Sequence, residues 1–375
     1  MNTTSYRPSN RSPYEGGPYG RQRLREGLPW LRLLLLVSLL ATASILAGIV
    51  LLPAKGGEHE EAPPLAAGGA ARPVYPASLI QELAQPANGQ WLLPAAAVTV
   101  GDAEFVLDTG GGRILKLDQT GRIVATLDST SDERLILRQP MAMTSDGHRL
   151  FVANSLAAQV LVIDPSGRVE KALPIPAVTP GEKTPRPIGI AVTSDNRIIV
   201  SDADNHRILI LNDQGGLIKA LGTGARAGGT DGFNVPGSIA LDNVGNIYVV
   251  DTLNGRVVEL SPDGAFVRQF GQFGNTAGML SRPKGVAVDS QGRVFVSDGL
   301  LAAIEVFAPD GTYLGIIGPR DPSNPLSASL FQAPAGLWLA GDRLYVTDRL
   351  AGLITLRLPS ATTPQQATTG EGEGR

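Results

Sequence analysis

Six polar side chains that carry oxygen atoms recur along this chain, and each one ends a short apolar run. They follow one another at intervals of 46 to 50 residues: Asp108, Asn154, Asp202, Asp251, Asp298 and Asp348. Carboxylate and amide oxygens that converge on one point bind hard divalent cations, and they also accept hydrogen bonds from polar ligands. One chemical hypothesis is therefore a ring of oxygen ligands for a cation or a polar molecule.

An arginine stands five residues after three of these carboxylates, and this pattern favours a structural role. The pairs are Asp108 with Arg113, Asp202 with Arg207, and Asp251 with Arg256. Where Asn154 replaces the aspartate, Gln159 replaces the arginine. Because a guanidinium can bond both oxygens of a carboxylate, the spacing predicts a local ion pair across a turn, bidentate where the geometry allows.

Two of the five aspartates lack this arginine. Asp298 and Asp348 have Ala303 and Leu353 at the corresponding position, so we single them out as acidic residues that could contact a ligand. The alternative is an Asx turn, in which the carboxylate bonds nearby backbone N–H groups and no ligand is involved.

A second marker repeats together with the polar residues and defines the unit that carries them. A proline opens a small apolar run at intervals of 46 to 51 residues: Pro94, Pro140, Pro187, Pro236, Pro283 and Pro334. Within each unit, short apolar runs alternate with glycine-containing turns such as 261–264, which is typical of antiparallel hairpins. The sequence therefore predicts an all-β fold, a six-bladed β-propeller of four-stranded antiparallel blades.

The two ends of the repeat region predict how the ring closes. The first strand of each unit is rich in Ala, Gly and Val, as at 285–289, which suits a crowded centre. The last unit stops after three strands near Leu358, whereas Ser78–Leu83 resembles a strand of the fourth type without a unit of its own. Pairing these two segments would close the ring and leave no open edge. An open solenoid is the alternative.

The units resemble the NHL repeat, strongly in the third to fifth, less in the first and weakly in the second and sixth. Its usual form is an apolar pair, Asp, two further residues, Asn-His/Gly-Arg and then Ile or Val, which matches 200–208 and 250–257. The Pro-x-Gly-Ile/Val-Ala-Val openings at 187–192 and 283–288 are also similar to that family. The resemblance covers roughly 78–358. It implies a propeller that binds other molecules, mostly proteins and in some cases RNA, and does not imply one activity.

The N-terminal region predicts a membrane anchor. Leu33–Leu52 contains no charged residue and, as a helix, is long enough for one bilayer core. Arginines precede it and glutamates follow it, which predicts a cytoplasmic N-terminus and an extracytoplasmic propeller. A cleaved signal peptide is the alternative.

These observations give five predicted segments. They are a disordered cytoplasmic tail at 1–29, a single-pass signal anchor at 30–52, a flexible linker at 53–77, the propeller at 78–359, and a disordered tail at 360–375.

Composition limits the chemistry. The chain has no cysteine, which excludes disulfides and thiol nucleophiles. Its formal net charge of −3 argues against nucleic acid as the main partner. The partners that we expect are the membrane, through the anchor, and a protein or glycan outside the cytoplasm.

Long loops lead into the first strands and are expected on the same face as the strand-end carboxylates. Two of them are the most individual, and loops on a rigid ring usually carry specificity. Their candidate ligand-binding residues are Arg320, Asp321 and Asn324 in one loop and Arg226 and Asp231 in the other. Ordinary connecting loops are the alternative.

The residues directly after the marker prolines are expected to line the mouth of the channel. They are Ala95, Met141, Ile188, Gly237, Lys284 and Ala335. The gluconolactonase-like propellers, which this fold resembles, hold a divalent metal in the channel through carboxylates and amides. One lysine and no carboxylate make a poor metal site, so we predict no metal and no cofactor. Lys284 is a candidate for an anion contact, with a solvated lysine as the alternative.

A histidine site is also not expected, because His59, His148 and His206 cannot converge from their positions in the repeat. The function predicted from sequence is therefore a membrane-anchored, extracytoplasmic, non-catalytic binding scaffold for a protein, peptide or envelope glycan. The alternative is a gluconolactonase-like or lyase-like propeller hydrolase with a divalent metal.

Overall fold

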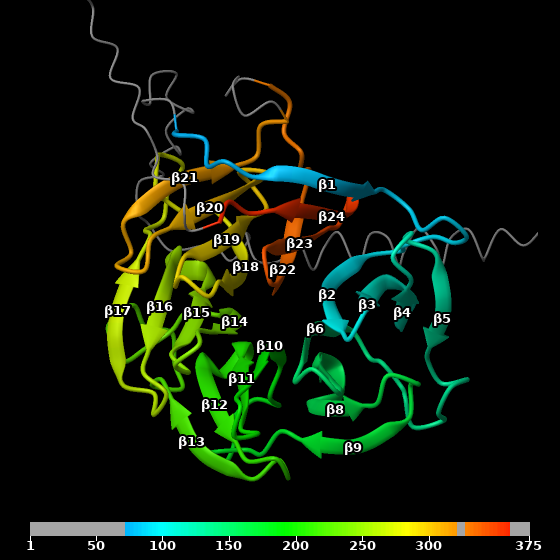
Figure 1. The fold of residues 1–375 in the computed structure, drawn as a ribbon. Coiled ribbons are helices and arrows are strands. Elements are labelled where there is room, and N and C mark those ends of the chain that lie inside the picture. Colours follow the sequence, from blue (N-terminus) through cyan, green and yellow to red (C-terminus); the bar gives the residue numbers. More distant parts are fainter. Residues whose placement is uncertain (1–71, 321–326, 361–375) are drawn as a thin grey trace, which may run out of the picture. The chain divides into compact units, whose positions relative to one another are not determined.

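Residues 72–320 and 327–360 are described by the computed structural model, and they form six four-stranded antiparallel sheets. The sheets are arranged around a central axis as the blades of a β-propeller (Figure 1). The inner strands of successive blades are neighbours around the whole ring, and the inner strand of the last blade contacts that of the first. The predicted six-bladed fold with antiparallel four-stranded blades is confirmed.

The first three blades follow one another along the chain. Blade 1 contains β2 (Pro94–Val100), β3 (Ala103–Asp108), β4 (Arg113–Leu117) and β5 (Ile123–Leu127). Blade 2 contains β6 (Pro140–Ser145), β7 (Leu150–Asn154), β8 (Gln159–Ile163) and β9 (Val169–Pro174). Blade 3 contains β10 (Pro187–Val192), β11 (Ile198–Asp202), β12 (Arg207–Leu211) and β13 (Leu217–Leu221).

The next two blades repeat the pattern and the last one differs. Blade 4 contains β14 (Pro236–Leu241), β15 (Ile247–Asp251), β16 (Arg256–Leu260) and β17 (Phe266–Phe270). Blade 5 contains β18 (Pro283–Val288), β19 (Val294–Asp298), β20 (Ala303–Phe307) and β21 (Tyr313–Ile317). Blade 6 contains β22 (Pro334–Ala340), β23 (Arg343–Asp348), β24 (Gly352–Arg357) and, as its outer strand, β1 (Ser78–Leu83).

Short 3-10 turns join the second and third strands of blades 1 to 4. They are η1 (Thr109–Gly111), η2 (Ser155–Ala157), η3 (Ala203–Asn205) and η4 (Thr252–Asn254).

The two sequence markers face each other across the first hairpin of every blade. The paired positions are Pro94–Asp108, Pro140–Asn154, Pro187–Asp202, Pro236–Asp251, Pro283–Asp298 and Pro334–Asp348. The register shifts directly after each of these prolines, as in a β-bulge. Because proline has no N–H to donate, it fits the end of the ladder, where this corner of the blade meets the incoming loop.

The centre of the ring is as crowded as the small residues predict. A Cβ added to Gly285 would collide with the carbonyl oxygen of Ala335 in the next blade. A Cβ added to Gly189 would collide in the same way with the carbonyl oxygen of Gly237. Glycine is therefore required at these positions so that the inner strands of adjacent blades can approach each other.

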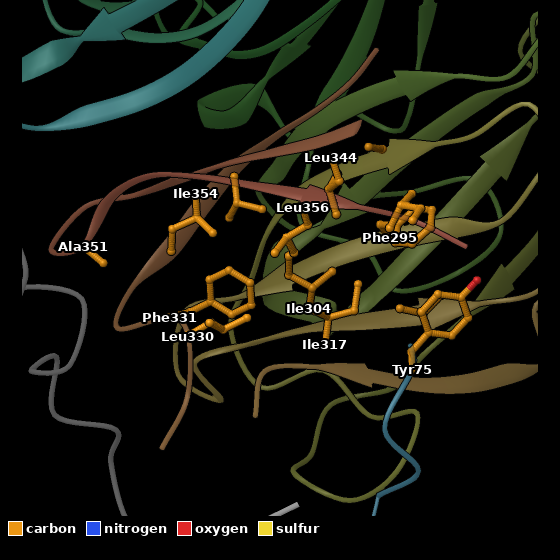
Figure 2. Close-up of a cluster of buried hydrophobic side chains, with 14 residues drawn as sticks. Tyr75, Phe295, Ile304, Ile317, Leu330, Phe331, Leu344, Ala351, Ile354 and Leu356 are labelled. Atoms are coloured by element: carbon orange, nitrogen blue, oxygen red, sulfur yellow. The ribbon is translucent and has the colours of Figure 1, made fainter. Parts of the chain in front are cut away.

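The hydrophobic core lies between the blades. Each of the six clusters of buried side chains draws on two neighbouring blades, so that every blade packs on both of its faces. Figure 2 shows the cluster between blades 5 and 6, where Phe295 and Ile304 of blade 5 meet Leu344 and Ile354 of blade 6. A blade separated from its neighbours would expose both of these apolar faces, which makes closure of the ring decisive for stability.

The ring closes through the predicted pairing of the two ends of the repeat region. β1 pairs antiparallel with β24, from Ser78 opposite Arg357 to Leu83 opposite Leu353. The blue β1 lies beside the red β24 in Figure 1. The predicted closure by Ser78–Leu83 is confirmed, and the pairing leaves no gap between the first and the last blade.

A second attachment precedes β1 and corrects the expected linker boundary at residue 77. The backbone N–H of Tyr75 donates to the carbonyl of Ile316 in β21 (2.7 Å), and the N–H of Ile316 donates to the carbonyl of Pro73 (2.9 Å). Arg72 forms an ion pair with Glu305, whose side chain is fully buried. The segment from residue 72 onward therefore belongs to the propeller, because it extends the edge of blade 5 before β1 joins blade 6.

The predicted anchor, the tail before it and the linker up to residue 71 lie outside the described residues, as do residues 361–375. Among residues 72–320 and 327–360, no helix has the length and apolar character needed to cross a bilayer. The anchor at 30–52 stays a prediction.

The attachment at Glu305 predicts a pH dependence of stability. Burial raises the pKa of Glu305 from its ordinary 4.5 to about 7, although the Arg72 guanidinium opposes this shift. Between these two values the folded state keeps a proton that the unfolded state has lost, so the free energy of unfolding falls as pH rises. The accumulated loss is roughly 3 kcal/mol above pH 7.

Glu305→Gln removes this titration. We expect the melting temperature of the natural chain to fall relative to that of the variant between about pH 5 and about pH 8. Other titrating groups, such as His206, are present in both chains and cancel in the difference. Thermal unfolding across this pH range checks the prediction, and a difference that does not change with pH would contradict it.

Candidate functional site

The loop-rich face of the propeller is formed by the loops that enter the first strands and by the turns that follow the second strands. The strand-end polar side chains connect these two sets of segments. The carboxylate of Asp298 accepts hydrogen bonds from the N–H groups of Ser281 (2.7 Å) and Arg282 (2.9 Å), directly before the marker proline. Its other oxygen accepts from the N–H groups of Leu300 and Leu301 in its own turn, both at 3.0 Å.

The same arrangement, which we call the loop clasp, recurs in all six blades. Asp348 accepts from the N–H groups of Gln332 and Ala333 on one oxygen and from Leu350 and Ala351 on the other, all within 2.9 Å. In the remaining blades the N–H donors before the proline are Leu92 and Leu93 to Asp108, Arg138 to Asn154, Arg186 to Asp202, and Asn234 to Asp251. All six polar side chains are fully buried. A buried carboxylate needs such donors to offset its lost hydration.

The predicted aspartate–arginine pairs occupy the second oxygen in three blades. The Nε of Arg113 lies 3.0 Å from Asp108, the Nη2 of Arg207 lies 2.9 Å from Asp202, and the Nε of Arg256 lies 2.8 Å from Asp251.

The bidentate partner of Arg207 differs from the expected one. Its two terminal nitrogens bond both oxygens of Glu182 in the entry loop, whereas only one oxygen of Asp202 contacts the guanidinium. Arg256 similarly donates to the carbonyls of Gly228, Gly229 and Gly232. These arginines therefore fix the entry loops in addition to the turns.

The ligand hypothesis for Asp298 and Asp348 is corrected by this geometry. Both side chains are fully buried, and each already accepts four backbone hydrogen bonds. Backbone N–H groups replace the arginine that these two blades lack. The Asx-turn alternative, extended by the bonds to the entry loop, describes both residues.

The candidate residues in the loops have different positions. Arg320 forms a bidentate ion pair with Glu82 of β1, with both distances at 2.9 Å, and its hydrogen bonds lower the pKa of that glutamate. Arg320 therefore binds β1, the strand that closes the ring. Asp321 and Asn324 lie outside the described residues. Arg226 and Asp231 are exposed in the entry loop of blade 4, where they remain available to a ligand.

A cavity of about 480 Å³ occupies the channel along the axis of the ring. Within the described chain, its lining includes all six residues that were expected at the channel mouth, among them Lys284. It also includes Arg349, which the sequence analysis did not single out. The rest is mostly Ala, Val, Ile, Leu and Met, and no lining residue carries a carboxylate or an imidazole.

Three cationic residues line the cavity, namely Arg186, Lys284 and Arg349. Burial lowers the pKa of Lys284, and the nearby Arg349 and Arg282 guanidinium groups lower it further, against the opposing effect of Asp298. Burial also lowers the pKa of Arg349. Both directions show that this part of the channel destabilises cations.

Exposed apolar side chains also gather on the loop-rich face. A leucine stands two residues after the strand-end polar residue in four blades: Leu156, Leu253, Leu300 and Leu350. Their exposed fractions are 65%, 47%, 64% and 71%. The entry loops add Leu92, Ile136 and Phe273, which are also exposed. We call these seven residues the apolar rim. The recurrence of leucine at this repeat position was visible in the sequence and was missed.

The two histidines in the described chain, His148 and His206, take part in local hydrogen bonding and lie in different parts of the fold. The Nδ1 atom of His206 accepts a hydrogen bond from the N–H of Val235 (3.0 Å), and burial together with Arg226 and Lys183 lowers its pKa. The described residues contain no group of three His, Asp or Glu side chains that could hold a metal ion.

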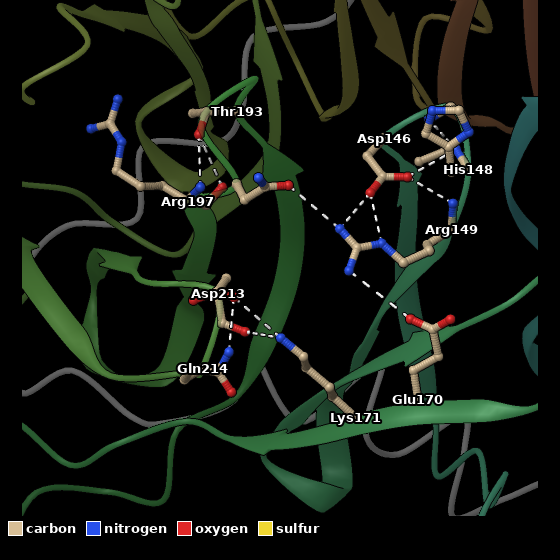
Figure 3. A network of polar contacts seen from close by, with 12 residues as sticks. Asp146, His148, Arg149, Glu170, Lys171, Thr193, Arg197, Asp213 and Gln214 are labelled. Atoms are coloured by element: carbon tan, nitrogen blue, oxygen red, sulfur yellow. Dashed lines mark hydrogen bonds and ion pairs between the residues drawn. The ribbon is translucent and has the colours of Figure 1, made fainter.

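His148 lies on the opposite face, in a polar network that Figure 3 shows. There Arg149 bonds Asp146 of its own turn at 2.7 Å and reaches Asn196 of blade 3 at 3.4 Å. Lys171 of blade 2 similarly contacts Asp213 of blade 3. This network connects two blades and does not converge on a cavity in the channel.

Comparison with known proteins supports the fold assignment. The family profile described as NHL repeat matches residues 184–211, which span β10 to β12. Together with the six-bladed ring, this match confirms the resemblance that the sequence indicated. A comparison with curated protein sequences found no significant match.

Solved structures with the same fold include several enzymes. A catalytically inactive virginiamycin B lyase from Staphylococcus aureus, with quinupristin, is 16% identical with a TM-score of 0.54, covering 74% of this chain and 99% of that one. A gluconolactonase from Xanthomonas campestris is 17% identical with a TM-score of 0.52, covering 78% of this chain and 99% of that one. At these identities the likeness shows the fold alone.

The loop clasp predicts a large effect of a single substitution. Asp298→Ala would remove the buried acceptor of four partly buried N–H groups and should lower the free energy of unfolding by roughly 2–4 kcal/mol. Asp310→Ala is the matched control, because this aspartate bonds the N–H of Thr312 in an exposed turn of the same blade. Chemical denaturation of the full-length chain checks both variants. Similar losses for the two would contradict the clasp.

Proposed function

We propose that this chain is a membrane-anchored, extracytoplasmic propeller that binds a protein partner through its loop-rich face and catalyses no reaction. The apolar rim is the observation that carries this proposal. Seven large apolar side chains stand exposed on one face of a rigid ring, and a protein partner that covers this face would remove them from water. The loop clasps support it further, because they hold the loops that carry the rim.

The chemistry of the rim favours a protein or peptide over an envelope glycan. Leucine and phenylalanine side chains gain free energy when a partner removes them from water, and they offer no hydrogen bonds to sugar hydroxyls. Arg226 and Asp231, exposed in the entry loop of blade 4, would add polar contacts at the margin. Such polar margins around an apolar centre are usual in protein interfaces.

The proposed location depends on the N-terminal region. The uncharged run at 33–52 and the arginines before it support a single-pass anchor with the N-terminus in the cytoplasm. The segment at 72–75, which is hydrogen-bonded to β21 of blade 5, is where the described chain begins after the predicted linker.

The alternative is a gluconolactonase-like or lyase-like hydrolase that uses a divalent metal in the channel. The donor set does not fit this group, since Lys284 and Arg349 line the cavity and the described lining residues include no carboxylate or imidazole. Two cationic side chains would repel a divalent cation. We therefore derive no reaction step through a metal for this chain.

One labelling experiment tests both the location and the binding face. Because the chain has no cysteine, Leu300→Cys and Val244→Cys each introduce a single thiol. Val244 is the matched control, since it is 74% exposed in the turn between β14 and β15, at the opposite end of the blade. A membrane-impermeant maleimide that carries a photoreactive group is added to intact cells that express each variant.

We expect both variants to be labelled in intact cells, because the propeller lies outside the cytoplasm. After illumination, the label at position 300 should give a cross-linked product of defined mass, and the label at position 244 should give none. Labelling only after lysis would refute the location. Equal cross-linking at the two positions, or none at position 300, would refute the binding face.

A further inference from the structure

Two cations in the channel stand at repeat positions where the other blades carry uncharged residues. Arg349 directly follows the clasp aspartate of blade 6, where the other blades have Thr109, Ser155, Ala203, Thr252 and Gly299. Lys284 directly follows the marker proline of blade 5, where the other blades have Ala95, Met141, Ile188, Gly237 and Ala335. The fold does not need a charge at either position, because five blades form without one.

These two side chains lie near each other in the same cavity. They come from adjacent blades and both line the channel, and the Arg349 guanidinium lowers the pKa of Lys284. A third cation of the lining, Arg186, is different because its Nε bonds Asp204 at 2.8 Å. Within the part of the chain that the structure describes, neither Lys284 nor Arg349 forms an ion pair, and the buried Nε of Arg349 has no hydrogen-bond partner.

Most of the remaining lining is apolar, and the hydroxyl groups of Thr144, Ser145, Ser238 and Thr252 add polar atoms to it. Ile190, Ile239, Val286 and Leu337 line the cavity, together with the ring of Trp338. Its volume of about 480 Å³ lies within the usual range for small-molecule sites, which combine an apolar wall with a few convergent polar groups. Two cations that form no ion pair are unfavourable in such surroundings, even though the clasp carboxylate of Asp298 partly offsets the charge of Lys284, and an anion between them would relieve this cost.

We propose that the channel binds a small organic acid, with its carboxylate between Lys284 and Arg349 and its apolar body against the channel wall. Arg349 supplies planar N–H donors that match a carboxylate, and Lys284 supplies a point charge beside it. The ligand is monoanionic and compact, because only one end of the cavity is cationic and the rest offers dispersion contacts. This inference goes beyond the binding of a protein at the loop-rich face and does not depend on it.

A carboxylate could also come from an acidic side chain of a bound protein. Such a side chain would bind Lys284 and Arg349 in the same way as the free acid, but it would leave the apolar channel beyond them unfilled. The cavity therefore favours the free acid, and a peptide probe separates the two sources.

The test uses the full-length chain in lipid nanodiscs, with empty nanodiscs as the blank, and isothermal titration calorimetry. Cyclohexanecarboxylate is the probe and cyclohexanecarboxamide is its uncharged match. A third probe is an acetylated and amidated tripeptide with a central glutamate between two alanines. We expect the carboxylate to bind at least tenfold more tightly than either the carboxamide or the tripeptide.

Variants assign the binding to the two cations. Lys284→Met and Arg349→Met should each weaken binding of the carboxylate at least tenfold and leave binding of the carboxamide unchanged. Arg138→Met is the matched control, since Arg138 is an exposed arginine at the entry to blade 2 and should change affinity less than twofold. Without ligand, Lys284→Met and Arg349→Met should melt at the same temperature as the natural chain or higher, because each removes a partly buried cation that forms no ion pair.

Three results with the free acid and its variants would overturn the proposal. They are the absence of carboxylate binding, equal affinity for the carboxylate and the carboxamide, and carboxylate affinity that survives both substitutions. Tighter binding of the tripeptide than of the free acid would also overturn it, because the carboxylate would then belong to a protein partner. None of these results bears on the cross-linking at position 300, so the two proposals fail separately.

Discussion

The loop clasp is the interaction on which the rest of this structure depends. In every blade a buried carboxylate or amide at the end of the second strand accepts hydrogen bonds from the N–H groups that precede the marker proline. Because a buried charge without donors is costly, the loop is held where its N–H groups reach the oxygen. This fixes the start of each inner strand, and thereby the approach of neighbouring blades around the channel.

The turn after the clasp divides three tasks among three consecutive residues. In blade 6, Asp348 holds the entry loop, Arg349 lines the channel, and Leu350 is exposed on the loop-rich face. The first position is constrained by hydrogen bonding in every blade, whereas the residue types at the other two differ from blade to blade. The same short turn therefore holds the entry loop, places a cationic side chain in the channel and contributes a leucine to the apolar rim.

The sequence predicted the fold well because its period is set by backbone requirements. Residues such as Pro283 and Asp298 recur once in every blade because each blade joins its entry loop to the end of its second strand in the same way. The pairing of Ser78–Leu83 with β24 could be predicted because the last unit lacked a fourth strand. The site was less predictable. The sequence left the role of Asp298 open between a ligand contact and an Asx turn, because its partners are backbone N–H groups, which no residue type reveals. Arg349 was missed because its approach to Lys284 depends on the angle between two blades.

Amide hydrogen exchange of the full-length chain at single-residue resolution tests the loop clasp most directly. The amides of Ser281, Arg282, Gln332 and Ala333 lie in loops, yet they should exchange almost as slowly as those of the inner strands, through global unfolding. The amide of Thr312 is the comparison, because it bonds the carboxylate of Asp310 in an exposed turn and should exchange much faster. Fast exchange at all five amides would contradict the account.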